Sequence, residues 1–244
     1  MSQSFIFHQL FESRSSTYTY LLADPVSQEA VLIDPVLETV DRDLQLLKEL
    51  GLKLKYVLDT HIHADHITGA GVIRQRTAAK TAVSKKSKVA CVDLPLSHGD
   101  QLHFGPFIIH VIETPGHTDS CLSFYCEDRV FTGDALLIRG TGRTDFQGGS
   151  AENLYDSVTE KLFKLPSETL VYPAHDYQGF TASSVENEAL HNPRLGKSKT
   201  KADFVKTMSE LKLAYPQKID EALPANRACG ETSKSAATQN QVRP

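Results

Sequence analysis

Short runs of aromatic and branched apolar residues, separated by turn residues, make up the first part of the chain. Three such runs occupy 5–11, 18–23 and 30–34. Runs of this length and composition predict the strands of an antiparallel sheet. Apolar residues then recur three and four positions apart, which predicts a helix that Thr39 caps and Gly51 ends. The run at 54–58 predicts a buried strand.

The rest of the chain continues this alternation of strands and helices. Further strands are predicted at 81–83, 101–104, 107–112, 121–125, 129–132 and 169–172. Further helices are predicted at 67–77, 150–163, 182–190 and 201–211. This order indicates an α+β fold, an αββα sandwich of two mixed β-sheets flanked by helices. We expect one domain over 1–230 with a short helical C-terminal extension, and a disordered tail over 231–244.

The composition excludes several classes of protein. The 244 residues are 40% hydrophobic, enough for a substantial core, and the formal net charge is -4. The lack of a basic run argues against nucleic acid as a partner, and no stretch approaches the ~20 apolar residues of a membrane span. The four cysteines form no C-x-x-C pair and are interpreted as free thiols. Because residues 1–5 do not resemble a targeting signal, we expect a cytoplasmic enzyme or binding protein.

The heptapeptide 60–66 follows the predicted strand at 54–58 and combines three imidazoles with one carboxylate. These side chains are His61, His63, Asp65 and His66. In an extended segment, residues two apart point to the same side, so His61 and His63 are predicted to face one point. Asp65 and His66 are predicted to face a second, neighbouring point. Imidazole and carboxylate suit Zn, Fe, Ni or Cu, whereas nothing structural requires this cluster at a strand end.

Three more candidate ligands follow predicted strands. They are His117, Asp134 and His175. An Asp after Gly is usually a turn residue, but Asp134 supplies the carboxylate that completes a site rich in imidazole. Four other histidines are interpreted as strand or surface side chains: His8, His98, His103 and His110. His191 lies beside Asn192-Pro193-Arg194, near the expected rim of the site.

Four motifs, taken in order, resemble the motif series of the metallo-β-lactamase superfamily over residues 5–195. They are His61-x-His63-x-Asp65-His66, Pro115-Gly116-His117, Thr132-Gly133-Asp134 and Pro173-Ala174-His175. The resemblance implies the αββα fold and one or two metal ions at the edge of the sandwich. Two branches fit. Persulfide (sulfur) dioxygenases bind one Fe(II), and hydroxyacylglutathione hydrolases (glyoxalase II) use two metals to hydrolyse a thioester.

Longer strings look like the dioxygenase branch. They are residues 134–147, His175-Asp176-Tyr177-x-Gly179-Phe180, Asn192-Pro193-Arg194-Leu195 and residues 224–230. The region after His175 is also short, whereas glyoxalase II normally carries a longer helical domain there. One departure concerns Thr141, because a cysteine is common at that position in the branch. Cys229 lies in the C-terminal string, and its role is left open.

The resemblance implies a role for each matching residue. The iron ligands would be His61, His117 and Asp134, a two-histidine, one-carboxylate set with open positions that suits Fe(II) and O₂. Arg143 matches an arginine that contacts glutathione, and Tyr177 would act as a catalytic residue near the substrate sulfur. The remaining candidates would be hydrogen-bond partners around the metal or positions of a vacant second site: His63, Asp65, His66 and His175.

The implied reaction is the oxidation of glutathione persulfide by O₂ and water to sulfite and glutathione, with one Fe(II) per chain, in sulfide detoxification. The alternative is a binuclear thioester hydrolase with two Zn, Fe or Mn ions. In it, Asp134 would bridge one site made of His61, His63 and His117 and another made of Asp65, His66 and His175. A non-catalytic metal-binding sensor is a third hypothesis. A homodimer is expected only by analogy with the branch.

Overall fold

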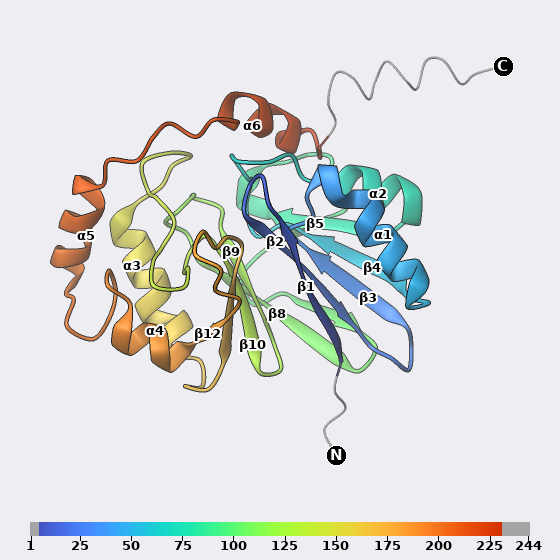
Figure 1. Cartoon of the computed structure of the whole chain (residues 1–244), viewed down its shortest axis with the longest axis horizontal. Helices are drawn as coiled ribbons and strands as arrows, with labels where there is room; N and C mark the ends of the chain where they lie inside the picture. Colours follow the sequence, from blue (N-terminus) through green and yellow to red (C-terminus); the bar gives the residue numbers. More distant parts are fainter. Residues whose placement is uncertain (1–4, 231–244) are drawn as a thin grey trace.

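The computed structural model describes residues 5–230, which form four layers: two six-stranded sheets lie face to face, with helices on both outer sides (Figure 1). The first sheet has the order β1 (Ile6–Glu12), β2 (Thr17–Ala23), β3 (Glu29–Ile33), β4 (Lys53–Leu58), β5 (Lys80–Ser84), β6 (Leu94–Leu96). Strands β1, β2 and β3 pair antiparallel, and the pairs from β3 through β6 are parallel. The predicted mixed αββα sandwich is therefore confirmed.

The second sheet is also mixed. Its order is β12 (Ser183–Ser184), β11 (Leu170–Pro173), β10 (Arg129–Gly133), β9 (Leu122–Cys126), β8 (Phe107–Glu113), β7 (Gln101–Phe104). Only β10 and β11 pair in parallel. Their parallel pairing matters for the site, because both strands then end at the same edge of the sheet.

Alternation along the strands builds the core. In β2, Tyr20 and Leu22 face the second sheet, whereas Leu21 between them packs with the outer helices. The inter-sheet layer also contains Phe104, Phe124 and Phe131. All of these side chains are buried, so the two sheets form one continuous apolar layer that fixes the positions of the strand ends.

The helices cover the two outer faces. Those packed on the first sheet are α1 (Val40–Glu49) and α2 (Ala70–Thr77), and those on the second are α3 (Ala151–Glu160), α4 (Val185–His191) and α5 (Lys201–Glu210) (Figure 1). The last helix, α6 (Ile219–Arg227), contacts Ile67 through Ala222 and Ala225. Single 3-10 turns occupy Leu37–Thr39, Lys85–Ser87 and Leu162–Lys164. None of the helices in the described range is long and apolar enough to cross a membrane.

Two predicted helix caps have different outcomes. The Ser150 hydroxyl accepts a hydrogen bond from the Asn153 amide, as expected of a cap. The Thr39 hydroxyl instead donates to the Val36 carbonyl, so it does not cap α1. The helix after the histidine cluster begins at Ala70, later than predicted, because Thr68 is hydrogen-bonded to Asp59.

The prediction of four free thiols was wrong for two of them. Cys91 and Cys229 form a disulfide between residues 138 positions apart, while Cys121 and Cys126 are free and buried. The pairing joins the loop before β6 to the segment after α6. The predicted tail at 231–244 lies outside the described residues, and the prediction of one domain over 1–230 stays a prediction.

Candidate metal centre

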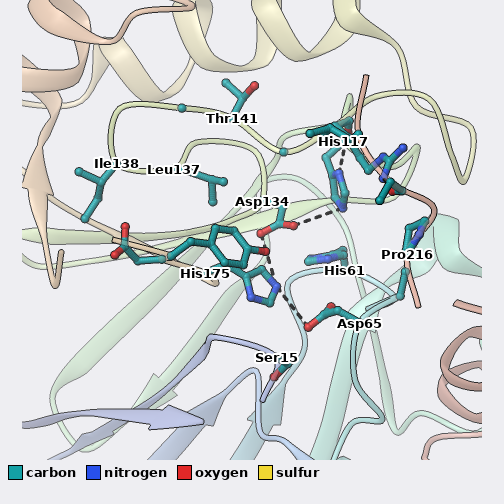
Figure 2. A pocket seen from close by; sticks show the side chains of 18 of the residues that line it. Ser15, His61, Asp65, His117, Asp134, Leu137, Ile138, Thr141, His175 and Pro216 are labelled. Carbon is teal, nitrogen blue, oxygen red and sulfur yellow. Dashed lines mark hydrogen bonds and ion pairs between the residues drawn. The ribbon is translucent and has the colours of Figure 1, made fainter. Parts of the chain in front are cut away.

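Four strand ends bring the candidate ligands to one edge of the sandwich. The histidine loop, residues 59–68, follows β4. His117 lies four residues after Glu113, the last residue of β8. Asp134 and His175 follow the parallel strands β10 and β11. Figure 2 shows these side chains pointing toward one another in a cavity of about 600 Å³. The strand ends thus assemble side chains that are far apart in the sequence.

Three of these residues form a compact group of possible metal ligands. One ligand atom from each of His61, His117 and Asp134 lies within 4.8 Å of the others. The His117 Nε2 atom is 3.5 Å from Asp134 Oδ2, and the His61 and His117 rings meet edge to face with their centroids 4.9 Å apart. Two imidazoles and one carboxylate therefore converge on one point.

A hydrogen bond at Nδ1 orients each of the two imidazole rings. His117 Nδ1 donates to the Arg143 carbonyl oxygen at 2.7 Å. Thr60 Oγ1 donates its own hydrogen to Asp34, so it accepts from His61 Nδ1 at 3.0 Å. Both rings therefore keep the lone pair of Nε2 free. Orienting hydrogen bonds of this kind are typical of histidines that ligate a metal.

The charge state of the group also fits a cation. Burial, with His63 and His117 close by, lowers the pKa of His61 well below its usual range, so its imidazole is neutral, as ligation requires. The Asp134 Oδ1 atom is buried and has no hydrogen-bond partner among the described residues. A buried carboxylate oxygen without a partner is costly, and a bound cation would remove that cost.

A second group lies beside the first. Its members, His63, Asp65 and His66, also have ligand atoms within 4.8 Å of one another. His66 Nδ1 donates to Asp65 Oδ2 at 2.9 Å, whereas His66 Nε2 and His63 Nδ1 are buried without a hydrogen-bond partner in the described chain. His175 Nε2 lies 3.6 Å from Asp65 Oδ2 and 3.8 Å from Asp134 Oδ1, which links the two groups.

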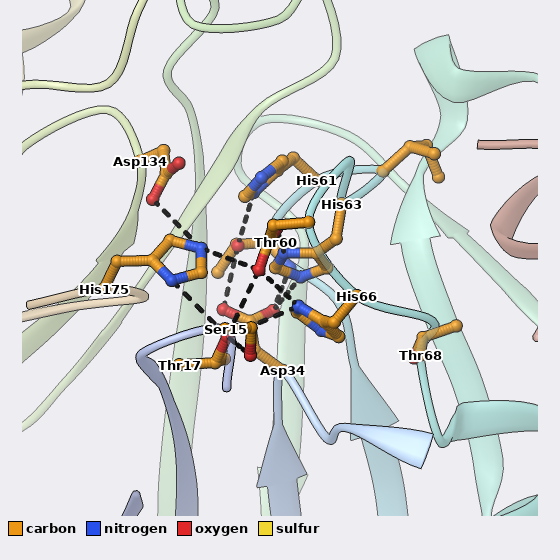
Figure 3. A network of polar contacts seen from close by, with 12 residues as sticks. Ser15, Thr17, Asp34, Thr60, His61, His63, His66, Thr68, Asp134 and His175 are labelled. Carbon is orange, nitrogen blue, oxygen red and sulfur yellow. Dashed lines mark hydrogen bonds and ion pairs between the residues drawn. The ribbon is translucent and has the colours of Figure 1, made fainter. Parts of the chain in front are cut away.

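The His61 and His63 rings lie side by side, with their centroids 4.1 Å apart, but the two residues fall in different groups of possible ligands. His61 groups with ligands from the second sheet, whereas His63 groups with its neighbours in the loop. Asp34 accepts a hydrogen bond from His63 Nε2 at 3.2 Å and so orients that ring (Figure 3). Although burial opposes protonation, the Asp34 carboxylate raises the pKa of His63 to about 9.

Sequence reasoning missed Asp34 as part of the site. Its carboxylate also accepts from the Thr60 amide at 2.7 Å and from the Thr60 hydroxyl at 2.9 Å. The contact depends on a strand pairing that the sequence did not show: Asp34 follows β3, and β3 pairs in parallel with β4, whose Leu58 is opposite Ile33. Residues just beyond two paired parallel strands are neighbours.

Arg143 lines the cavity, but its guanidinium is already engaged. Its Nε and Nη2 atoms donate to the two oxygens of Asp145 at 2.6 and 2.7 Å, and Nη1 donates to the Ala214 carbonyl at 2.7 Å. The group also lies over the Phe146 ring. Arg143 therefore ties the loop after β10 to residues 213–217, which form part of the cavity wall.

Arg194 and Tyr177 complete the cavity. Arg194 donates to the carbonyl and hydroxyl of Thr141, and burial lowers its pKa. Within residues 5–230 no carboxylate forms an ion pair with it, so it is a cation available to a ligand. Thr141 itself is buried and positions this arginine. The exposed Tyr177 ring stacks parallel to His175 at the cavity edge.

Comparisons with known proteins point to one family. A profile of the Metallo-beta-lactamase superfamily matches residues 13–175. The chain is 53% identical over 233 residues to "Persulfide dioxygenase ETHE1, mitochondrial" of Homo sapiens, which covers 95% of this chain and 91% of that protein. It is 30% identical over 261 residues to "Glyoxylase B2" of Dictyostelium discoideum, with 90% of this chain and 89% of that protein covered.

A solved structure gives the same result. The crystal structure of ETHE1 from Myxococcus xanthus is 55% identical to the chain and has a TM-score of 0.91, with 93% of this chain and 100% of that chain covered. The fold, the order of the ligand motifs and the profile match agree with each other. The chain belongs to the metallo-beta-lactamase superfamily.

Proposed function

We propose that this protein is a persulfide dioxygenase that oxidises glutathione persulfide with O₂ and water to sulfite and glutathione. The observation that carries the proposal is the convergence of His61, His117 and Asp134, with both imidazole Nε2 atoms free. Two histidines and a carboxylate with open positions suit non-haem Fe(II). Identity of 53–55% to proteins named as this enzyme or as ETHE1, over more than nine tenths of the chain, supports the same activity.

We propose one Fe(II) per chain at this trio. When bound, Fe(II) would bring the terminal sulfur and O₂ together and relay electrons between them. We propose that the second group serves as hydrogen-bond partners, in which Asp65 accepts from His66 and Thr17, and His63 donates to Asp34. In this role His63, Asp65, His66 and His175 orient water and substrate around the metal.

The cavity wall suits a peptide with two carboxylates. Arg194 is the partly buried cation without a carboxylate partner in the described chain, so it is the first candidate to bind one carboxylate of glutathione. Arg143 contributes its remaining N–H groups and positions residues 213–217. Three further cations line the cavity: Arg14, Arg139 and Lys218. We therefore assign glutathione binding to several cations of the cavity wall and not to Arg143 alone.

Other residues shape the reacting end of the substrate. The Tyr177 hydroxyl lies at the cavity edge beside His175 and would donate a hydrogen bond near the persulfide sulfur. Leu137 and Ile138 line the same cavity (Figure 2) and exclude water from the substrate stem. The reaction balances without a further reductant, because the outer sulfur supplies the electrons that O₂ accepts and water supplies the third oxygen of sulfite.

Parallel assays separate this proposal from its alternatives. The protein is purified without oxygen, its metal content is measured, and O₂ uptake with glutathione persulfide is assayed beside hydrolysis of S-lactoylglutathione. Iron with persulfide-dependent O₂ uptake supports the dioxygenase. Thioester turnover with two metals would instead establish the binuclear hydrolase, and bound metal with neither activity would establish the sensor. The homodimer and the cytoplasmic compartment stay predictions.

A further inference from the structure

The end of α6 contacts the histidine loop through one buried side chain. Asn226 Nδ2 donates to the carbonyl oxygens of His63 at 2.8 Å and His66 at 2.9 Å, and its Oδ1 accepts from the Thr68 amide at 2.8 Å. An amide side chain offers two donors and an acceptor, so a single residue satisfies three backbone groups of the loop. Loss of these bonds would leave those groups buried and unpaired.

Asn226 acts on a part of the loop that Asp34 does not fully fix. Asp34 contacts Thr60 and the His63 side chain at the beginning of the loop. Asn226 contacts backbone groups from His63 to Thr68, at the end of the loop. The two anchors together determine the loop conformation between β4 and α2, and therefore the direction of the ligand side chains that the loop carries.

The C-terminal segment, residues 226–230, lies directly against the loop and α2. A Cβ atom at Gly71 would be 2.2 Å from the Cys229 carbonyl oxygen, and a Cβ atom at Gly230 would be 2.3 Å from the Thr68 carbonyl oxygen. Both positions require glycine for this close approach. The apolar contact behind it is small, because α6 contributes Ala222 and Ala225 to a cluster with Ile67 and the partly buried Leu37.

A covalent bond compensates for this small contact. Cys229 is three residues beyond Asn226, and its sulfur is bonded to Cys91 in the loop between β5 and β6. The Cys91 carbonyl oxygen also accepts a hydrogen bond from Arg74 of α2. The disulfide therefore joins the C-terminal segment to the sheet that carries the histidine loop. Breaking it leaves the Asn226 hydrogen bonds, the small apolar cluster and the Lys218–Glu38 ion pair to keep α6 and the segment in place.

We propose that Asn226 is a positioning residue for the metal-binding loop and that the Cys91–Cys229 disulfide keeps it in place, so that thiol reductants loosen the loop. In the reducing step, a dithiol transfers two electrons and two protons. The S–S bond breaks, each cysteine gains a hydrogen, and the dithiol becomes a disulfide. The inference goes beyond the proposed reaction, since it concerns metal retention and not persulfide turnover.

The first test replaces Asn226 by its isostere. Asn226→Asp keeps the acceptor for Thr68 but places a carboxylate oxygen against two carbonyl oxygens. Hydrogen exchange of the loop amides is measured in the metal-free protein, and transfer of bound metal to a chelator in the loaded protein. We expect faster exchange and about tenfold to hundredfold weaker metal binding. The control is Asp220→Asn, which changes an exposed residue of the same helix whose side chain accepts a hydrogen bond from Tyr215. Unchanged exchange and unchanged metal transfer in Asn226→Asp would overturn the proposal.

The second test leaves Asn226 intact. Dithiothreitol is added to the metal-free wild-type protein and to Cys91→Ser, and exchange of the amides at 60–68 is compared. We expect the reductant to raise wild-type exchange to the level of Cys91→Ser and to leave that variant unchanged. Equal exchange in wild type with and without reductant would refute the role of the disulfide. So would alkylation of both Cys91 and Cys229 in the native, unreduced protein. Neither test uses persulfide, so failure here is distinct from failure of the proposed activity.

Discussion

His117 Nδ1 donates a 2.7 Å hydrogen bond to the main-chain carbonyl of Arg143. One residue thus has two separate functions, because its backbone orients a metal ligand while its side chain binds Asp145 and the wall segment at Ala214. The metal centre and the substrate wall are connected at this position. Substitution of the side chain should therefore separate substrate affinity from metal binding.

Arg143→Lys removes the two-pronged contact with Asp145 but preserves the backbone carbonyl. We expect KM for glutathione persulfide to rise about tenfold, since an ammonium group does not reproduce a planar fork, with metal content unchanged. Steady-state kinetics and metal analysis on the same preparation check this. An equal loss of metal would show that the side chain, and not only the carbonyl, supports His117.

His117→Ala and His175→Ala should differ in metal content. His117 belongs to the trio of His61, His117 and Asp134 whose ligand atoms converge, so its removal should abolish iron binding. His175 lies 3.8 Å from Asp134 and 3.6 Å from Asp65, and its removal should retain the iron while lowering turnover. Metal analysis after anaerobic purification measures both. Two metal ions per chain in the wild type and one in His175→Ala would instead indicate a binuclear site.

Gly142→Ala should damage the site without a general effect on the fold. A Cβ atom there would lie 2.5 Å from the Asp134 carbonyl oxygen and 2.8 Å from His117 Nδ1. We expect metal affinity to fall by at least about tenfold, because the bond that orients His117 is displaced. Gly140→Ala is the matched control, since its Cβ would meet only Leu137 at 3.9 Å. Similar metal affinity in the two variants would contradict the assignment.

Asp43 in α1 gives a pH-dependent prediction far from the centre. Its side chain is fully buried, and burial raises its pKa to about 6, with Arg42 opposing the rise. The folded state thus binds a proton more tightly than the unfolded state, so this residue destabilises the protein as pH rises through 6. Relative to wild type, Asp43→Asn should gain about 1 kcal/mol of unfolding free energy between pH 5 and pH 8. Urea unfolding at the two pH values measures this, and a constant difference would refute it.

The sequence predicted the fold well where local patterns decide the structure. The strand predicted at 18–23 matches β2, and the helix beginning after Ser150 matches α3. Short elements were missed where no pattern exists, as in β6 with its central proline and in α6 with Pro224 inside the helix. Local periodicity carries no signal for such segments, whose conformation depends on tertiary contacts.

The candidate ligands could be found from sequence motifs, but the residues that hold them in position could not. His117 and Asp134 follow strands and stand in motifs, and the structure brings them to His61. Asp34, Asn226 and the partner of Cys229 each depend on contacts between distant segments, 138 positions apart for the disulfide. Spacing in one sequence does not encode such pairings. The engagement of Arg143 with Asp145 likewise depends on a loop conformation that composition does not specify.

O₂ consumption and sulfite formation, followed together on the iron-loaded protein with glutathione persulfide, test the central claim most directly. We predict equal amounts of O₂ consumed and sulfite formed, with no added reductant, and no measurable hydrolysis of S-lactoylglutathione. Hydrolysis of S-lactoylglutathione by a two-metal protein that consumes no O₂ would contradict the assignment of His61, His117 and Asp134 to a single oxygen-using centre.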